Sequence, residues 1–169
     1  MKIASYVFIV LAAAFLLMVP LGKAGGGMSP QSNTQKIAKI QQDLKCLTDN
    51  VYYEARNQPY VGKVAVAFVT LNRVQHDSFE DNICDVVKSR TSRTCQFSWV
   101  CERVKPARTD FEKRAYKESQ EVAYRVINNY NNMVDPTSGS IYFHATYVAP
   151  KWKNQKQRIV RIDDHIFYR

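Results

Sequence analysis

Residues 44–74, LKCLTDNVYYEARNQPYVGKVAVAFVTLNRV, are the stretch that decides the fold. Apolar side chains in its first half, and just before it, recur at intervals of three and four: Ile37, Ile40, Leu44, Leu47, Val51 and Ala55. This spacing predicts an amphipathic helix that begins near Lys36 and ends near Asn57, before Pro59. A second helix over about residues 61–74 is apolar around most of its circumference, so we expect it at the centre of the core.

The sequence after this stretch predicts one more long helix and a small β element. Residues 75–110 are polar with only short apolar pieces, so we expect a loop with short helical turns. Helical spacing resumes over residues 111–130, with Asp110 as the expected N-cap. After the turn residues 135–139, short extended pieces predict a small hairpin: Ile141, Phe143, residues 158–162 and residues 166–168. The expected fold class is therefore mainly α (α+β), with a single core.

The first 35 residues differ in kind from the rest. Lys2 is followed by an uncharged, largely apolar run and then by small residues around Ala24. This pattern is typical of a secretory signal peptide, so we expect residues 1–24 to be removed on export. Residues 3–21 are also about long enough to cross a bilayer, which leaves an uncleaved membrane anchor as the alternative. Residues 25–35, GGGMSPQSNTQ, are expected to be a flexible linker to a folded domain over residues 36–169.

The expected exported part is basic. Residues 1–24 contain two of the 24 basic side chains and none of the 15 acidic ones, so the remainder carries a formal charge of +7. Such an excess favours anionic partners, which outside a cell include wall polymers and peptide carboxylates. Nucleic acid is not expected, because Lys and Arg are scattered and no nucleic-acid-binding motif accompanies them.

Four cysteines lie in the expected exported part: Cys46, Cys84, Cys95 and Cys101. In an oxidising compartment they are disulfide candidates, and four cysteines allow three pairings. We expect Cys84 with Cys95, which closes a short polar loop, and Cys46 with Cys101. Because no pair has the spacing of a structural zinc site, and the chain has only three histidines, we expect no metal site. We expect no cofactor either.

Glu54 is the candidate catalytic residue. At about 100° per residue it lies within about 20° of Leu47 around the axis of the first helix, so it faces the core side. It also lies in the last helical turn, where the helix dipole and apolar neighbours both disfavour an ionised acid. A raised pKa of this kind suits a glycosidase general acid. The alternative is a structural carboxylate that pairs with Arg56 or Arg73.

Residues 95–99, CQFSW, form a candidate sugar-binding surface. Phe97 and Trp99 offer aromatic faces for pyranose rings, and Gln96 and Ser98 offer hydrogen-bonding groups. The alternative is that these aromatic rings simply cover the core.

Residues 142–152, YFHATYVAPKW, again combine aromatic residues with a histidine. His144 and Trp152 are candidate substrate contacts, and His144 could instead orient Glu54. The alternative for His144 is a hydrogen-bonded core histidine, and for His165 we expect that structural role.

Six motifs in order resemble one known family. They are YYEAR at 52–56, VGKVAVAFVTLNRV at 61–74, CDVV at 84–87, CQFSW at 95–99 with Cys101, YFHATYVAPKW at 142–152 and DHIFYR at 164–169. Together they resemble the cell wall hydrolases of the SleB/CwlJ type, the catalytic domains of spore-cortex-lytic enzymes, over essentially all of residues 44–169. The chain departs from the usual family pattern at Asn57 or Gln58, where members typically have glycine.

The resemblance implies a compact, lysozyme-like helical domain that cleaves peptidoglycan glycan strands between N-acetylmuramic acid and N-acetylglucosamine, with Glu54 as the acid. Tyr53 and Asn72 lie in the same motifs and are further candidate substrate contacts. Because the N-terminal segment predicts export, we expect the enzyme in the periplasm or cell wall, membrane-anchored if residues 3–21 are retained. We expect it to be a monomer.

Ordinary glycosidases use two carboxylates, and no second one lies in a motif expected at the cleft. A single acid suits the lytic transglycosylases, which the family is thought to include and which form 1,6-anhydro products. One alternative is a muramidase that uses water, helped by Glu102 or Asp85, which otherwise are solvated loop charges. The other is a basic wall-binding module that docks on the wall without cutting it.

Overall fold

The structure is a computed structural model that describes residues 30–92, 94–102 and 104–169. Within these ranges the elements are α1 (Pro30–Ala55), α2 (Tyr60–Val74), α3 (Ile83–Lys88), α4 (Ser98–Cys101), α5 (Asp110–Asn129), β1 (Tyr142–Ala145), the 3-10 helix η1 (Lys151–Gln155), β2 (Arg158–Ile162) and β3 (His165–Tyr168). The predicted signal peptide or anchor lies outside the described residues. None of the helices described is both long and apolar enough to cross a membrane.

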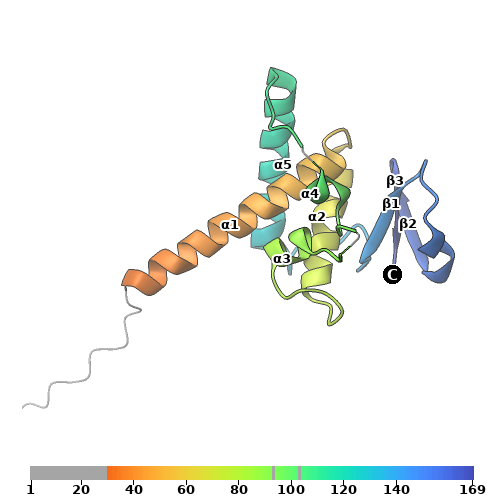
Figure 1. The fold of residues 1–169 in the computed structure, drawn as a ribbon, viewed down its shortest axis with the longest axis horizontal. Coiled ribbons are helices and arrows are strands. Elements are labelled where there is room, and N and C mark those ends of the chain that lie inside the picture. The colour runs from red at the N-terminus through yellow and green to blue at the C-terminus, as the bar shows by residue number, and fades with distance from the viewer. Residues whose placement is uncertain (1–29, 93, 103) are drawn as a thin grey trace, which may run out of the picture.

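Helix α1 begins earlier than the sequence predicts. Residues 30–35, expected in the linker, are helical from Pro30, a residue that suits the first turn because its missing N–H would have no partner there. The first half of α1 projects away from the other helices (Figure 1), and Ile37 and Ile40 are more than half exposed. The apolar spacing thus predicts the helix correctly, but only its second half, from about Leu44, faces the core.

Helix α2 is the central helix, as predicted. All of its residues from Gly62 to Arg73 are buried. One side, with Phe68, packs against the second half of α1 and against α5. The other side, with Ala65 and Val69, packs against Phe167 of the sheet, which lies beyond α2 in Figure 1. This helix therefore joins the helical layer to the β layer.

The segments around α2 confirm the remaining helix predictions with one correction. The polar region 75–110 contains the short helices α3 and α4, and the third long helix is α5. Its N-cap is Thr109, not Asp110. The hydroxyl of Thr109 accepts a hydrogen bond from the Glu112 N–H while the Glu112 carboxylate accepts from the Thr109 N–H, a reciprocal capping box.

The C-terminal β element is larger than the predicted hairpin. Strands β2 and β3 form that hairpin, and β1 pairs with the other edge of β3, which gives an antiparallel sheet of order β1-β3-β2. Opposed residues include Phe143 with Phe167 and His144 with Ile166. Because side chains alternate between faces, Phe143 and Phe167 share the inner face toward α2, and His144 and Ile166 share the outer face.

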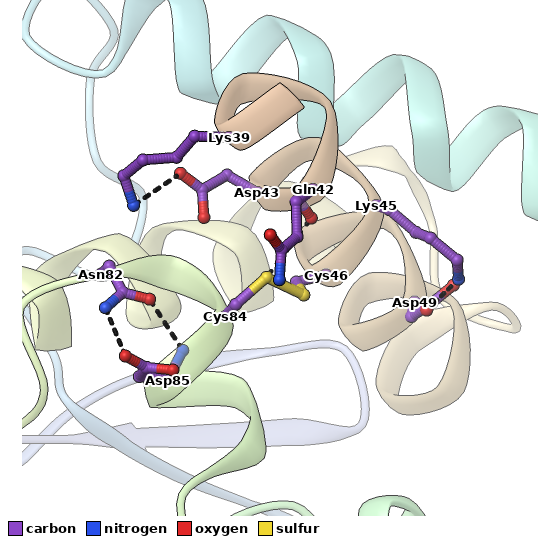
Figure 2. Close-up of a disulfide and its surroundings, with 9 residues drawn as sticks. All are labelled: Lys39, Gln42, Asp43, Lys45, Cys46, Asp49, Asn82, Cys84 and Asp85. Carbon is purple, nitrogen blue, oxygen red and sulfur yellow. Dashed lines mark hydrogen bonds and ion pairs between the residues drawn. A yellow bond between two sulfur atoms is a disulfide. The ribbon is translucent and has the colours of Figure 1, made fainter. Parts of the chain in front are cut away.

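The disulfide pairing expected from the sequence is wrong. The structure pairs Cys46 with Cys84 and Cys95 with Cys101. Cys46 lies on the core-facing part of α1 opposite α3, where Cys84 is buried beside it, as Figure 2 shows. Cys95 and Cys101 are brought together because the chain turns back through α4. Packing between α1 and α3, which sequence spacing does not reveal, decides the first pair, and the local turn through α4 decides the second.

Candidate active site

A cleft of about 770 Å³ lies between the C-terminal end of α1, the segment around α4 and one end of the sheet. Of the predicted site residues, it brings together Tyr53, Glu54, Gln96, Phe97, Ser98, Trp99 and His144. These come from three regions that are far apart in the sequence. The helical core and the sheet thus form the two walls of one cleft.

Glu54 lies on the floor of this cleft and is partly buried. The pKa of its carboxyl is raised to about 7, mainly because burial disfavours the charged form; the nearby cation of Arg73 opposes this rise, and the negative charge of Glu102 adds to it. The predicted rise in pKa is therefore confirmed, with desolvation as its main cause. In the part of the chain described, Glu54 forms no ion pair within 4.0 Å with Arg56 or Arg73.

Arg73 is the main site residue that sequence reasoning missed. It is only 3% exposed, and its Nε donates a hydrogen bond to the carbonyl oxygen of Ile141 at 2.7 Å. Its guanidinium lies over the rings of Phe79 and Phe97, 5.3 and 5.0 Å from their centroids. Burial lowers the pKa of this guanidinium to about 10, so it remains a cation. An arginine in a helix that is apolar around most of its circumference was the signal that could have identified it.

Arg73 also holds one of the predicted sugar-binding residues. When the Gln96 amide is oriented with its oxygen toward Arg73, Oε1 accepts hydrogen bonds from Nη1 and Nη2 at 3.2 and 3.3 Å. The exposed Gln96 amide nitrogen is then free to face the cleft. Phe97 lines the cleft but is only 3% exposed and packs in the core, which bears out the alternative role for that ring.

Trp99 forms an aromatic wall together with Tyr53. Their rings are stacked, with centroids 4.7 Å apart and an angle of 27° between planes. The indole N–H of Trp99 donates to the side-chain oxygen of buried Asn50 at 3.1 Å. Asn50 in turn donates to the hydroxyl of Thr70 on α2 at 3.0 Å. The orientation of the wall is therefore fixed by the core beneath it.

The two histidines of the sheet have different surroundings. Nδ1 of His144 contacts the carbonyl oxygen of Ala145 at 2.8 Å, and Nε2 contacts the Tyr168 hydroxyl at 2.9 Å. Because a carbonyl only accepts, Nδ1 carries the proton of the neutral ring and Nε2 accepts from Tyr168. His144 thus lines the cleft with both ring nitrogens occupied, which fits the structural alternative.

His165 was expected to be structural, yet it lines the cleft near Glu54. Its ring packs edge-on against Phe143, and its buried Nδ1 has no hydrogen-bond partner among the described residues. Burial lowers its pKa, which keeps the imidazole neutral near neutral pH. No local pattern in the sequence indicates this position, because only the pairing of strands in the sheet brings His165 into the same cleft as Glu54.

Two predicted substrate contacts do not line the cleft. Trp152 packs on the outer face of the sheet against Tyr142, His144 and Tyr168. Asn72 is buried, where its amide nitrogen donates to Asp135 and to the Ser140 carbonyl and its oxygen accepts from Tyr130. Both side chains make contacts within the fold, and neither lines the cleft in which the other candidate substrate contacts meet.

Of the two acids that could act as catalytic helpers, only one lines the cleft. Glu102 lines the cleft with an exposed side chain, near enough to Glu54 to raise its pKa. Asp85 lies on α3, where its N–H and carboxylate bond to Asn82, and it does not line the cleft. Only Glu102 therefore stays a candidate helper.

The chain and its fold match known proteins. A family model described as Cell Wall Hydrolase matches residues 57–168. This chain belongs to the cell wall hydrolase family. The match begins just after Glu54, so it covers most of the cleft but not the candidate acid itself.

Curated relatives of this cell wall hydrolase are named spore cortex-lytic enzymes. One from Bacillus cereus is 30% identical over 149 residues, which cover 86% of this chain and 52% of the relative. One from Halalkalibacterium halodurans is 29% identical over 151 residues, which cover 86% of this chain and 42% of the relative. The chain thus spans about half the length of the curated relatives that it matches.

Two solved structures resemble this cell wall hydrolase. The catalytic domain of the germination-specific lytic transglycosylase SleB from Bacillus anthracis matches with a TM-score of 0.56 and 28% identity, over 76% of this chain and 95% of that domain. The catalytic domain of Bacillus cereus SleB matches with a TM-score of 0.53 and 29% identity, over 76% of this chain and 91% of that domain. The expected lysozyme-like, mainly helical fold with a small C-terminal β element is confirmed.

Proposed function

We propose that this chain cleaves peptidoglycan glycan strands between N-acetylmuramic acid and N-acetylglucosamine as a lytic transglycosylase, with Glu54 as general acid and then general base. The observation that carries the proposal is a partly buried carboxyl, with its pKa raised to about 7, on the floor of an open cleft with an aromatic wall. Near neutral pH a substantial fraction of this carboxyl holds its proton, as a general acid must.

The reaction is balanced without any further reactant. Glu54 gives its proton to the bridging oxygen, and the bond between that oxygen and C1 of the muramic residue breaks. The ionised Glu54 then takes the proton of the C6 hydroxyl of the same residue, and O6 bonds to C1 to close a 1,6-anhydro ring. The carboxyl is protonated again at the end, and no water is consumed.

Two features of the surroundings, the cation of Arg73 and burial, each favour one protonation state of Glu54. The nearby cation of Arg73 favours the carboxylate, so it stabilises the charge that forms when the proton leaves. Burial favours the protonated acid. The pKa near 7 is the balance of these effects, which lets one residue act first as acid and then as base.

A muramidase that uses water is the second candidate, and the position of Glu102 favours it. Glu102 lines the same cleft as Glu54 and is the only other carboxylate whose charge is a cause of the raised pKa of Glu54 in the part described. A glycosidase with two carboxylates would use it to activate water or stabilise the sugar cation. Its exposed side chain favours the one-acid reaction instead.

Digestion of purified sacculi tests the proposal. We expect the 169-residue chain to release soluble muropeptides and Glu54→Gln to release none, while the variant still sediments with the sacculi. If both proteins sediment equally with the sacculi and the wild-type chain releases no muropeptides, the result would instead support a wall-binding module. Export through residues 1–24, as a signal peptide or an anchor, remains part of this proposal, because the substrate lies outside the cytoplasm.

A further inference from the structure

A second hollow continues the cleft onto the outer face of the sheet. It has a volume of about 370 Å³ and shares His144, Tyr147 and Val148 with the cleft. We call it the outer groove and define it by its polar lining residues Lys153, Asn154 and Arg158 together with the shared Tyr147. The two hollows are therefore neighbouring parts of one surface.

The fold places this groove between β2 and the connection from β1 to β2. Arg158 begins β2, and Lys153 and Asn154 lie in η1, which covers the outer face of the sheet (Figure 1). Trp152 holds η1 to that face through contacts with Tyr142 and Tyr168. The groove is thus supported by packed aromatic rings.

The charge of the groove has one sign. Residues 146–162 contain five basic side chains and no acidic one, and no Asp or Glu lines the groove. Two of the five are engaged elsewhere, since Lys156 lies 4.1 Å from the centre of the Tyr142 ring and Arg161 donates to the Asp163 carbonyl. In contrast, Lys153 and Arg158 form no ion pair within the described ranges. The groove therefore presents two cations without counter-charges.

From this arrangement we infer that the outer groove binds the carboxylates of the stem peptide carried by a muramic residue that occupies the cleft. The inference rests on the proposed function, since it names the part of the substrate that the same site would recognise. Lys153 and Arg158 are its specificity-determining residues. Exposed Tyr147, between the two hollows, lies where the peptide would leave the sugar ring.

Continuity with the cleft selects the stem peptide over other wall anions. A stem peptide is covalently attached to the sugar, so once the ring is bound its carboxylates are held at a high effective concentration beside the groove. A separate anionic polymer gains no such advantage and would be attracted equally by the exposed Lys151, which does not line the groove. The structure thus predicts recognition that depends on the substituent of the bound sugar.

The test compares two substrates and two variants. The substrates are glycan strands with intact stem peptides and the same strands after an amidase has removed the peptides. The variants are Lys153→Ala/Arg158→Ala and the matched control Lys151→Ala, which removes a positive charge from η1 outside the groove. We expect the wild-type chain to prefer peptide-bearing strands in kcat/KM by about tenfold. The double variant should lose that preference, whereas Lys151→Ala should keep it.

Equal cleavage of both substrates by the wild-type chain would overturn the inference and leave the proposed function standing. So would a double variant that keeps the wild-type ratio. If the preference instead follows removal of wall polymers from the sacculi, the groove binds those anions and the inference is wrong. Sedimentation of the Glu54→Gln protein with each strand type measures the same preference without catalysis. If the wild-type chain proved inactive, the proposed function would be wrong, and the sedimentation result would still decide whether the outer groove recognises the stem peptide.

Discussion

Arg73 on α2 and Glu54 on α1 influence each other's protonation across the floor of the cleft. Arg73 lowers the pKa of Glu54, and Glu54 raises the pKa of Arg73, although no ion pair within 4.0 Å joins them in the described structure. Since burial dominates both groups, Glu54 still has a pKa of about 7 and Arg73 one of about 10. The cleft therefore contains an acid that can hold a proton beside a cation that cannot lose one near neutral pH.

The raised pKa of Glu54 predicts the alkaline limb of the activity profile. As the pH rises above about 7 the acid loses its proton, so kcat/KM should fall about tenfold per pH unit. Glu102→Gln removes a negative charge that raises this pKa, so the limb should move to lower pH while activity is kept. Rates of muropeptide release across pH 5–9 measure both effects. Loss of all activity in Glu102→Gln would point to the muramidase reaction.

The same pKa predicts how stability depends on pH. The unfolded chain has the ordinary glutamate pKa of 4.5, so between about pH 4.5 and 7 the folded state binds the extra proton and stability falls as the pH rises. Above this window the ionised Glu54 costs up to about 3 kcal/mol. Glu54→Gln should therefore be more stable than the wild-type chain at pH 8 and similar to it at pH 4. Urea unfolding at both values checks this, and an equal difference at both would contradict it.

The two disulfides should contribute differently to stability and to activity. Cys46–Cys84 is buried and spans 38 residues, so its loss should cost about 4 kcal/mol. Cys95–Cys101 spans 6 residues, and its loss should cost only about 2 kcal/mol. The shorter bridge encloses Gln96 to Trp99, which line the cleft. Its variant Cys95→Ser/Cys101→Ser should therefore lose more activity than its small loss of stability would explain. Denaturant midpoints and rates of muropeptide release, measured on both double serine variants, check this. A loss of activity that follows the loss of stability in both variants would contradict it.

Trp99 and Trp152 form a matched pair of substitutions. Trp99→Ala removes the aromatic wall of the cleft, so KM should rise about tenfold with little change in kcat. Trp152→Ala removes a ring from the outer face of the sheet and should lower the unfolding midpoint, with a smaller effect on KM. Steady-state kinetics on soluble glycan fragments separates the two. A larger KM effect at Trp152 would restore it as a substrate contact.

The local pattern of the sequence was enough to predict the long helices and the raised pKa of Glu54. Apolar spacing predicts α2 almost to the residue, and the position of Glu54 on the core side of α1 predicts its raised pKa. The same spacing predicts that the whole apolar face of α1 meets the core, which is wrong for its first half. Ile37 and Ile40 continue the apolar face but are more than half exposed.

The errors lie where distant segments meet. Cys46 pairs with Cys84 because α3 packs on α1, and His165 reaches the cleft because β3 is the middle strand of the sheet. Asn72 and Trp152 carry side chains that suit a sugar site, but the fold uses both for internal contacts. No local pattern distinguishes these outcomes, because each is decided by tertiary packing.

The mass of the released muropeptides tests the central claim most directly. Sacculi digested by the wild-type chain should yield anhydro-muropeptides, each lighter by one water than the hydrolysed product and without a reducing end. Glu54→Gln should yield none. Products with reducing ends from the wild-type chain, or anhydro products from Glu54→Gln, would contradict the account of Glu54 as the single acid and base of a lytic transglycosylase.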